Sequence, residues 1–460
     1  MLRSLVGSEM CIRDRLMSKL RILREFAAAR WLRPLRTRAA VERRQRRLLR
    51  SHLRFLRRRS PYFRDLLATR SFSELPLMDK SVMMSRFDEI NTVGVGKDGA
   101  LALAIANERS RDFDADLGSN SVGLSSGTSG HRGLFVVSSA ERDAWVGTVL
   151  ARTLPRGRLL GHRIALFLRA DNSLYESVGS RAVSFRYFDV YTDMDDNIAR
   201  LREYRPTILV APPSVLRLIA RAADAGGFDV VPQRVYSVAE VLELSDERRI
   251  TASLGQPVLH QLYQCTEGFL AHTCEHGVIH LNEDNILVER EALDAERFTP
   301  IVTDLRRRAQ PIVRYRLGDV LRERTRPCPC GSALTAIERI EGREGDTLVF
   351  RSLDGRDLPV FADVIARALL YAEGFDEYRI TQIGESRLQI ALDTLDDRSR
   401  RLVEDEVHAL ADRLGCERPN ITFVDYVNDG AVKLRRVVQE WGDRRLSLIH
   451  ISEPTRLLSI

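Results

Sequence analysis

The sequence predicts an α/β fold, with a large N-terminal domain of parallel-rich sheets covered by helices and a small C-terminal α+β domain. The chain has 460 residues, 44% of them hydrophobic, which suffices for a full core and two or three domains. In its middle, apolar strand-like runs alternate with helical stretches, as in parallel sheets covered by helices. From Phe350 onward the segments are shorter and of mixed type, which fits a small α+β domain.

The first elements are predicted to be basic amphipathic helices between Lys19 and Arg59. Leucines recur there at helical spacing among many arginines, opposed only by Glu25 and Glu42. This face, in a chain of net charge +7, fits a nucleic-acid or anionic-membrane surface, or else a solvated helical face. We favour the solvated face, because no aromatic residues interleave the arginines as a base-stacking platform requires.

The next elements follow from β-type and helical patterns. Arg163–Leu168 and Thr207–Ala211 predict strands, and residues 213–225 predict a helix. Residues 377–383 and 387–392 predict a pair of strands.

The end of the chain adds a charged surface helix, predicted from Asp397 to Leu414. Residues 1–16 and 446–460 resemble translated sequencing-adapter read-through, so we leave both out of the fold and expect the native start near Met17.

Two short runs predict an ATP site. The first is a flexible hydroxyl and glycine run whose backbone N–H groups are able to hold phosphate oxygens: Ser125, Ser126, Gly127, Thr128, Ser129 and Gly130. The second runs from Tyr263 to Glu267 and offers an aromatic face, a hydroxyl and a carboxylate, which suit adenine, an α-phosphate and Mg²⁺. No Walker A pattern occurs, so the predicted ATP site is not a P-loop.

Further motifs follow in a fixed order, at residues 237–241, 311–319, 340–343 and 433–437. With them the chain resembles the adenylate-forming (acyl-CoA synthetase) superfamily. It looks closest to the phenylacetate-CoA ligase branch, and within it to the deazaflavin-coenzyme adenylyltransferase-like members. The resemblance runs from about Leu75 to about Val437.

The resemblance implies roles for the nucleotide residues. The run from Ser125 to Gly130 would close over the β- and γ-phosphates, although Arg132 stands near the place where many relatives carry a lysine. Tyr263 would stack on adenine, Thr266 would bond the α-phosphate, and Glu267 would hold Mg²⁺.

Further residues extend this implied site around the nucleotide. Ala239 and Glu240 would lie along the adenine, and Asp319 would accept hydrogen bonds from both ribose hydroxyls. Arg343 would sit at the domain junction, near the ribose or the phosphates.

Lys433 is the residue that the resemblance implies for the first chemical step. Its ammonium would neutralise charge between the attacking carboxylate and the α-phosphate. The resemblance also implies that the small C-terminal domain is mobile and turns about a hinge near Arg343, where Gly345 tolerates a large backbone change. We therefore expect an ATP- and substrate-binding domain at 17–341 and a small lysine-bearing domain at 342–445.

A second cluster is independent of ATP. Cys274, His280, Cys328 and Cys330 offer the ligand types of a closed, structural zinc site, and the Cys-x-Cys-Gly run matches some relatives. His276 is a rival fourth ligand, and the alternative is a reduced cysteine pair in a tight turn.

The function that follows is ATP- and Mg²⁺-dependent adenylation of a carboxylic acid, then transfer of the acyl group to a thiol of CoA or of an acyl carrier protein's pantetheine. The resemblance suggests an aromatic acid, bound near residues 167–176 and Phe269, where Asp171 and Glu176 are candidates for reading a polar substituent. One alternative is transfer of AMP to a hydroxyl of a deazaflavin-like cofactor. Another is a catalytically silent nucleotide- or nucleic-acid-binding protein.

The setting follows from composition. We see no signal peptide and no transmembrane run, so we expect a cytoplasmic protein, monomeric or homodimeric, without a membrane or nucleic-acid partner. Six cysteines, one of them in the adapter-like start, do not predict a disulfide framework.

Overall fold

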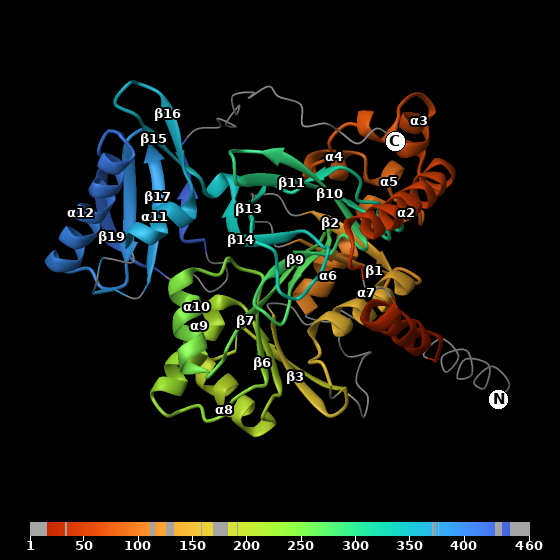
Figure 1. Cartoon of the computed structure of the whole chain (residues 1–460), viewed down its shortest axis with the longest axis horizontal. Helices are drawn as coiled ribbons and strands as arrows, with labels where there is room; N and C mark the ends of the chain where they lie inside the picture. Colours follow the sequence, from red (N-terminus) through yellow and green to blue (C-terminus); the bar gives the residue numbers. More distant parts are fainter. Residues whose placement is uncertain are drawn as a thin grey trace. The chain divides into compact units, whose positions relative to one another are not determined.

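The computed structural model describes residues 16–32, 35–110, 116–125, 133–157, 159–168, 183–190, 192–369, 372, 374–375, 377–427 and 435–441. The chain divides into two compact units (Figure 1). The large unit comprises Met1–Glu291, Thr299–Glu341 and Asp429–Leu434. The small unit comprises Ala292–Phe298, Gly342–Asn428 and Arg435–Ile460.

The helices before the small unit begin with residues 16–27, which continue into a π-helical turn, η1 (Ala28–Leu32). The others are α2 (Arg38–Arg59), α3 (Pro61–Thr69), η2 (Phe72–Glu74), α4 (Lys80–Ser85), α5 (Phe87–Ile90), α6 (Lys97–Ser110), α7 (Ser139–Thr153), α8 (Met194–Tyr204), α9 (Pro213–Asp224) and α10 (Leu244–Ser253).

The strands up to the start of the small unit's main part are β1 (Asn120–Leu124), β2 (Leu134–Ser138), β3 (His162–Leu168), β4 (Val183–Asp189), β5 (Ile208–Ala211), β6 (Arg234–Val238), β7 (Leu259–Cys265), β8 (Gly268–Thr273), β9 (Ile279–Leu281), β10 (Ile286–Ala292), β11 (Arg297–Asp304), β12 (Tyr315–Arg316), β13 (Asp319–Glu323) and β14 (Ala336–Arg343). All but the β1–β2 hairpin join one sheet of order β10-β11-β13-β14-β9-β8-β7-β6-β5-β3-β4, with β12 beside β11.

This sheet changes character at β7. From β4 to β7 every neighbouring pair is parallel, whereas the β7–β8, β8–β9 and β9–β14 pairs are antiparallel. The parallel half carries helices as the sequence predicts, because parallel strands need helical crossovers. The predicted α/β fold class is therefore confirmed, and the β7–β8 turn lies where the two halves of the sheet meet.

Alternation along β3 builds a core on each face of the parallel half. Ala165 and Phe167 pack with α8 and α9 residues on one face, whereas Ile164 and Leu166 pack with Val146 and Leu150 of α7 on the other. Figure 1 shows α8, α9 and α10 in green along one side of these strands. Only the α7 face lines the large cavity described below.

Part of the N-terminal arginine excess clamps α2 to the sheet. Arg38 Nη1 lies 2.7 Å from Glu283 Oε2, and Arg44 Nε donates to the Asp284 carbonyl at 2.6 Å. Gln45, buried in the same helix, donates to the Ile286 carbonyl at 2.9 Å. These contacts orient α2, so that its remaining arginines face outward.

The small unit is an α+β domain. Its main sheet has the order β19-β18-β17-β20, and a separate hairpin pairs β15 with β16. Apolar residues of α11 and α12 cover the inner side chains of β17 and β18. The elements are η4 (Glu344–Asp346), β15 (Leu348–Arg351), β16 (Asp357–Val360), α11 (Ala362–Leu369), β17 (Tyr378–Gly384), β18 (Arg387–Leu392), α12 (Asp397–Arg413), β19 (Asn420–Asp425) and β20 (Val437–Gln439).

Among the described residues, no helix is both long enough and apolar enough to cross a membrane.

A buried histidine in α2 makes stability depend on pH. His52 is 1% exposed, and neither ring nitrogen has a hydrogen-bond partner among the described residues. Burial and the nearby Arg308 charge lower the pKa of His52 from 6.5 to about 4. Between pH 6.5 and about 4, His52 is protonated in the unfolded chain but neutral in the folded chain. Its contribution to the free energy of unfolding is therefore highest above pH 6.5 and falls as the pH drops toward 4.

We expect a loss of about 1.4 kcal/mol per pH unit from this group in that window. Urea unfolding of wild type and His52→Leu at pH 7.0 and 5.0 measures it. The variant should lose less stability than wild type over that interval, and an identical loss in both proteins would contradict the assignment.

Candidate functional site

The predicted adenine and ribose residues meet in the large unit, although they are 56 residues apart in sequence. Tyr263, near the end of β7, donates its hydroxyl hydrogen to Asp319 Oδ2 at 2.5 Å. Each residue is 8% exposed. Asp319 begins β13 directly after Gly318, whose φ of +71° suits a tight turn into the strand. The result is an aromatic ring fixed beside an acceptor-only carboxylate.

The β7–β8 turn presents the next two polar groups. Thr266 Oγ1 donates to Glu267 Oε2 at 2.9 Å. Burial, the Glu267 charge and a hydrogen bond with Glu267 raise the pKa of Tyr315. Burial, with Glu267 and Asp319 nearby, raises the pKa of Cys265 well above its usual value, so this thiol stays protonated and is no nucleophile.

Arg307 ties this turn to the strand that follows the serine–glycine run. Its Nη1 donates to the Thr266 carbonyl, and its Nη2 lies 3.4 Å from Gln310 Oε1. Gln310 in turn accepts from Val136 N at 3.0 Å and donates to the Leu134 carbonyl at 3.0 Å. Arg307 and Gln310 therefore connect the β7–β8 turn to β2.

Lys80 lies at the base of the predicted phosphate loop. A small cavity of about 20 Å³ is lined by Lys80, Ser125, Gly133, Thr266 and Glu267, among others. Ser125 Oγ accepts from Gly133 N at 2.8 Å, which closes the base of the loop, and Lys80 packs against Gly133. Residues 126–132, which include Arg132, lie outside the described residues, so only Ser125 and Gly133 at the two ends of the loop are placed.

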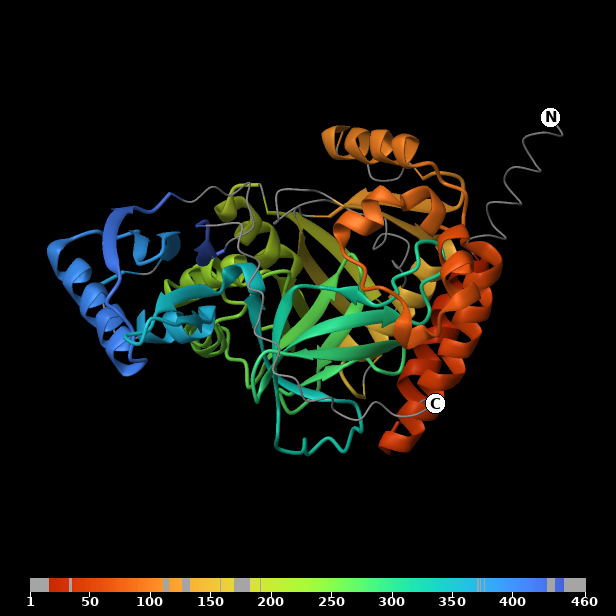
Figure 2. The same ribbon diagram turned by 90° about the horizontal axis from the view of Figure 1, so that it is seen from above.

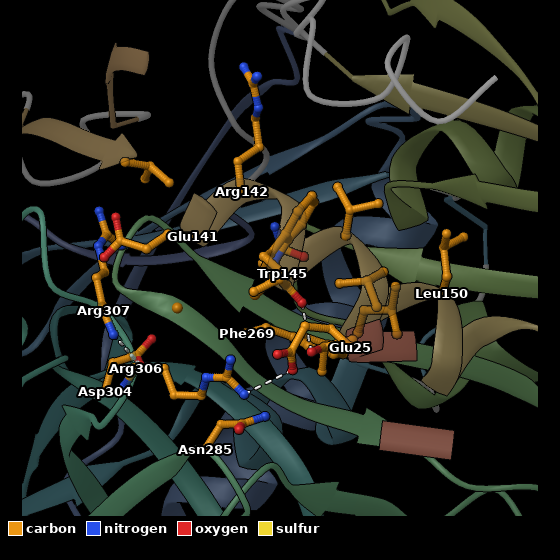
Figure 3. A pocket seen from close by; sticks show the side chains of 18 of the residues that line it. Glu25, Glu141, Arg142, Trp145, Leu150, Phe269, Asn285, Asp304, Arg306 and Arg307 are labelled. Atoms are coloured by element: carbon orange, nitrogen blue, oxygen red, sulfur yellow. Dashed lines mark hydrogen bonds and ion pairs between the residues drawn. The ribbon is translucent and has the colours of Figure 1, made fainter. Parts of the chain in front are cut away.

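A far larger cavity, of about 910 Å³, adjoins the same turn. Its apolar wall includes Trp145 and Leu150 of α7 and Phe269 of β8, which Figure 3 shows around the cavity. Glu25 and Arg306 contribute an ion pair to the wall, with Arg306 Nη1 at 3.0 Å from Glu25 Oε2.

The structure places the two aromatic residues named for the acid pocket differently. Phe269 lines the large cavity. Phe167 does not: it is fully buried on the other sheet face, where it stacks on Phe188 with 4.9 Å between ring centroids. It points to the same face as Ala165 and away from the cavity face of Ile164 and Leu166, because neighbouring strand residues point to opposite faces. Residues 169–182, which include Asp171 and Glu176, lie outside the described residues.

The four cysteine and histidine residues predicted to bind metal come together. The ligand atoms of Cys274, His280, Cys328 and Cys330 all lie within 4.8 Å of one another. His280 Nδ1 is 3.2 Å from the Leu334 carbonyl, and its Nε2 is 3.4 Å from Cys330 Sγ. One ring nitrogen is thus anchored to backbone while the other faces the thiols, as in metal-binding histidines. His276, the rival ligand, is exposed and not part of this cluster.

The fold resembles solved structures of ligases. A 2-hydroxyisobutyryl-CoA ligase, solved in the postadenylation state with 2-HIB-AMP, aligns over 88% of this chain and 89% of its own, at 16% identity and a TM-score of 0.66. The same ligase with 2-HIB-AMP and CoA, in the thioesterification state, gives a TM-score of 0.53 over 86% and 89%, at 16% identity.

The amide bond synthetase McbA from Marinactinospora thermotolerans gives a TM-score of 0.51 at 14% identity, over 68% of this chain and 67% of its own. The chain has the fold of adenylate-forming ligases. No family model matches the sequence, and no curated protein does.

Within this ligase fold, the other predicted residues are placed as follows. Ala239 lines the large cavity and adopts a φ of +67°, rare for a residue with a side chain, directly after β6. Glu240 Oε2 accepts from Ser214 N at 3.2 Å, so its side chain caps α9. Arg343 ends β14 in the small unit, and its backbone N–H donates to Asp346 Oδ2 at 3.1 Å. Lys433 lies outside the described residues.

Sequence reasoning missed Lys80, Arg307 and Glu25. Lys80 carried one usable signal, since the chain has only four lysines and the serine–glycine run lacks its own. Arg307 sits in a run of three arginines that looks like solvated surface, and Glu25 sits in a helix that looks merely basic. Only the folded structure brings these two to a cavity wall.

Proposed function

We propose that the protein uses ATP to adenylate a carboxylic acid and then transfers the acyl group to a thiol of CoA or of a carrier protein's pantetheine. In the first step a carboxylate oxygen attacks the α-phosphorus, the bond to the β-phosphate oxygen breaks, and pyrophosphate leaves. In the second step a thiolate attacks the acyl carbon and AMP leaves.

The position of Thr266 carries this proposal. Thr266 lines both the large apolar cavity and the small cavity beside Ser125 and Gly133. An acid in the first cavity and phosphates in the second would therefore meet at this residue. Proximity of this kind accelerates a reaction between two bound groups.

The surrounding residues support the nucleotide half. The Tyr263 ring offers a face for adenine, and Asp319 offers two acceptor oxygens for the ribose hydroxyls. The Glu267 carboxylate and the Thr266 hydroxyl are hard oxygen groups beside the small cavity, which fits them to hold Mg²⁺ together with phosphate oxygens. The ion would neutralise charge on the phosphates.

The large cavity supports an acid with a bulky, mainly apolar body. Aromatic rings of Trp145, Phe185 and Phe269 contribute to its wall, which suits stacking on an aryl group. Its volume of about 910 Å³ lies near the upper end of ligand pockets in proteins. We propose an aromatic acid, and the size of the cavity favours one larger than a single ring.

Pyrophosphate release from ATP tests this function. The assay uses a panel of aryl and alkyl acids of increasing size, with and without CoA. Release that depends on one acid class, with an acyl-thioester formed when CoA is present, is the expected result. Release that requires a hydroxyl acceptor and no acid would favour AMP transfer to a deazaflavin-like cofactor instead.

Lys80 is expected to supply the loop cation that the serine–glycine run lacks. Because a charge-assisted hydrogen bond contributes about 1.5–3 kcal/mol, Lys80→Met should raise the KM for ATP about tenfold or more. Lys97→Met, a lysine on α6 that does not line the small cavity, is the matched control. Equal KM values for the two variants would remove Lys80 from the phosphate site.

We also propose that the four-residue cluster binds a structural zinc ion. Cys274 follows β8, His280 lies in β9, and Cys328 and Cys330 lie between β13 and β14. Glu267 directly precedes β8, and Asp319 is the first residue of β13. The metal would therefore link the C-terminal ends of β8 and β13, whose N-terminal ends lie at the proposed nucleotide site. Four filled ligand positions suit a structural ion.

Purified protein is therefore expected to carry about one zinc per chain by elemental analysis, and a chelator should lower its melting temperature. Cys328→Ser with Cys330→Ser should abolish the zinc content. Cys416→Ser, a buried cysteine of the small unit, should keep it. Protein without zinc, or a double variant that retains it, would refute the site.

A further inference from the structure

Exposed apolar side chains gather on the N-terminal helical segment. Of the thirteen large hydrophobic residues that are exposed among the described residues, five lie within 17–32. They include Met17, Leu20, Leu23 and Trp31, which are 45%, 52%, 61% and 56% exposed. Such a concentration in one short segment marks an interaction surface, whereas scattered exposed leucines do not.

Helical geometry sorts this segment into two faces. Met17, Leu20 and Leu23 follow one another at spacings of three, so they form one outward stripe. Lys19 and Arg24, both exposed, lie beside that stripe. Ile22, Glu25 and Phe26 lie on the other face, toward α7 and the large cavity. The outward stripe is therefore additional to the face that packs on the core.

The segment is firmly docked, so the stripe keeps this orientation. Ser18 Oγ donates to Asp143 Oδ1 at 2.8 Å at one end of the segment. At the other end, Arg30 donates to the carbonyls of Ala151, Leu154 and Pro155, at 2.8, 2.8 and 2.7 Å.

Between these ends the backbones touch at Gly147. A Cβ there would come within 2.5 Å of the Ile22 carbonyl oxygen. Turning the leucines inward would thus break contacts at three points.

A stripe of arginines lies close by on α2. Exposed arginines recur at helical spacing along the outer face, at Arg43, Arg47, Arg50, Arg54 and Arg57, and the exposed Arg58 and Arg59 follow at the end of the helix. None of the seven has an ion pair within the described part of the chain. Residues of both segments line the large cavity, and Figure 2 shows both, in red, on one side of the large unit.

We propose that this combined face, residues 17–32 with the arginine stripe of α2, binds an anionic lipid surface, in place of the solvated face that the sequence favours. An apolar stripe flanked by cations suits a helix lying in the headgroup boundary, and an exposed tryptophan suits the same depth. The arginines would add attraction to anionic headgroups. This role is separate from the adenylation chemistry and does not rest on it.

Other occupants fit the face less well. A second copy across a two-fold axis would bring two unpaired arginine stripes toward each other, and like charges repel. A nucleic acid would use the arginines but would leave Met17, Leu20 and Leu23 in water. Lipid satisfies both features at once. Because Arg21, Arg24 and Glu25 also line the large cavity, a bound protein would hold this cavity beside the bilayer.

Co-sedimentation with vesicles tests the proposal on the full chain. Vesicles of equal phosphatidylglycerol and phosphatidylcholine are compared with pure phosphatidylcholine. Wild type should pellet with the anionic vesicles only. Leu20→Glu with Leu23→Glu should lower the bound-to-free ratio about tenfold or more. Leu160→Glu with Leu353→Glu adds the same charge at residues 63% and 76% exposed elsewhere, and should bind as wild type does.

Arg47→Gln with Arg54→Gln should weaken binding to the anionic vesicles and leave circular dichroism unchanged. Three outcomes overturn the proposal. One is no binding of wild type to anionic vesicles, and another is an equal loss in both glutamate pairs. The third is a concentration-dependent dimer in light scattering that Leu20→Glu with Leu23→Glu abolishes, since it would assign the face to a second copy.

Discussion

Replacing Asp319 by alanine is expected to weaken ATP binding about 100-fold or more. The carboxylate would lose two charge-assisted hydrogen bonds to the ribose, each contributing about 1.5–3 kcal/mol. The same change removes the hydrogen-bond acceptor of the buried Tyr263 hydroxyl, which donates to Asp319 at 2.5 Å in wild type. Isothermal titration with a non-hydrolysable ATP analogue measures the effect.

Tyr263→Phe is the matched control for that loss. It removes the hydroxyl that contacts Asp319 but keeps the aromatic face and the carboxylate, so ATP binding should weaken about tenfold or less. Circular dichroism confirms that both variants are folded. If Asp319→Ala binds the ATP analogue as tightly as wild type does, Asp319 does not bind the ribose, whatever the affinity of Tyr263→Phe.

Replacing Lys433 by alanine is expected to slow adenylation about 100- to 1000-fold while the affinity for ATP changes little. The ammonium would act mainly in the transition state, where negative charge builds up between the carboxylate and the α-phosphate. Removing it should therefore lower kcat. Single-turnover formation of acyl-AMP measures the rate. Normal adenylate formation in this variant would refute the assignment.

The neighbouring arginines support the choice of Lys433 and supply a control. Arg435 Nε donates to Asp346 Oδ1 at 2.9 Å. Arg436 is buried, lies 3.5 Å from Glu377 Oε2 and covers the Tyr378 ring. Both arginines are thus held by the small unit's own residues. Arg435→Ala should lower thermal stability without the loss of kcat that Lys433→Ala shows.

The fold was largely predictable because local patterns and tertiary packing agree. The run Arg163–Leu168 became β3 and residues 213–225 became α9, with boundaries that shift by a residue. The same pattern misled at Phe167, since an apolar run buried on both faces does not reveal which face each residue takes. The face was decided by β3 pairing with β4 and β5.

The candidate site was partly visible in the sequence. Tyr263, Thr266, Glu267 and Asp319 stand in short motifs, and the structure gathers them around one turn and one strand start. Lys80 and Arg307 do not, because their contribution depends on contacts across 41 residues or more, such as Arg307 with Thr266 and Lys80 with Gly133. No local pattern encodes such a contact, so sequence reasoning had no direct signal for it.

Isotope transfer from the acid to AMP tests adenylation most directly. With an acid labelled in both carboxylate oxygens by ¹⁸O, attack on the α-phosphorus places a labelled oxygen between the acyl carbon and phosphorus. When a thiol then displaces AMP, that oxygen stays with phosphorus, so mass spectrometry should find one ¹⁸O in each AMP. AMP without label would show that the acid does not attack ATP, and would contradict the proposed function.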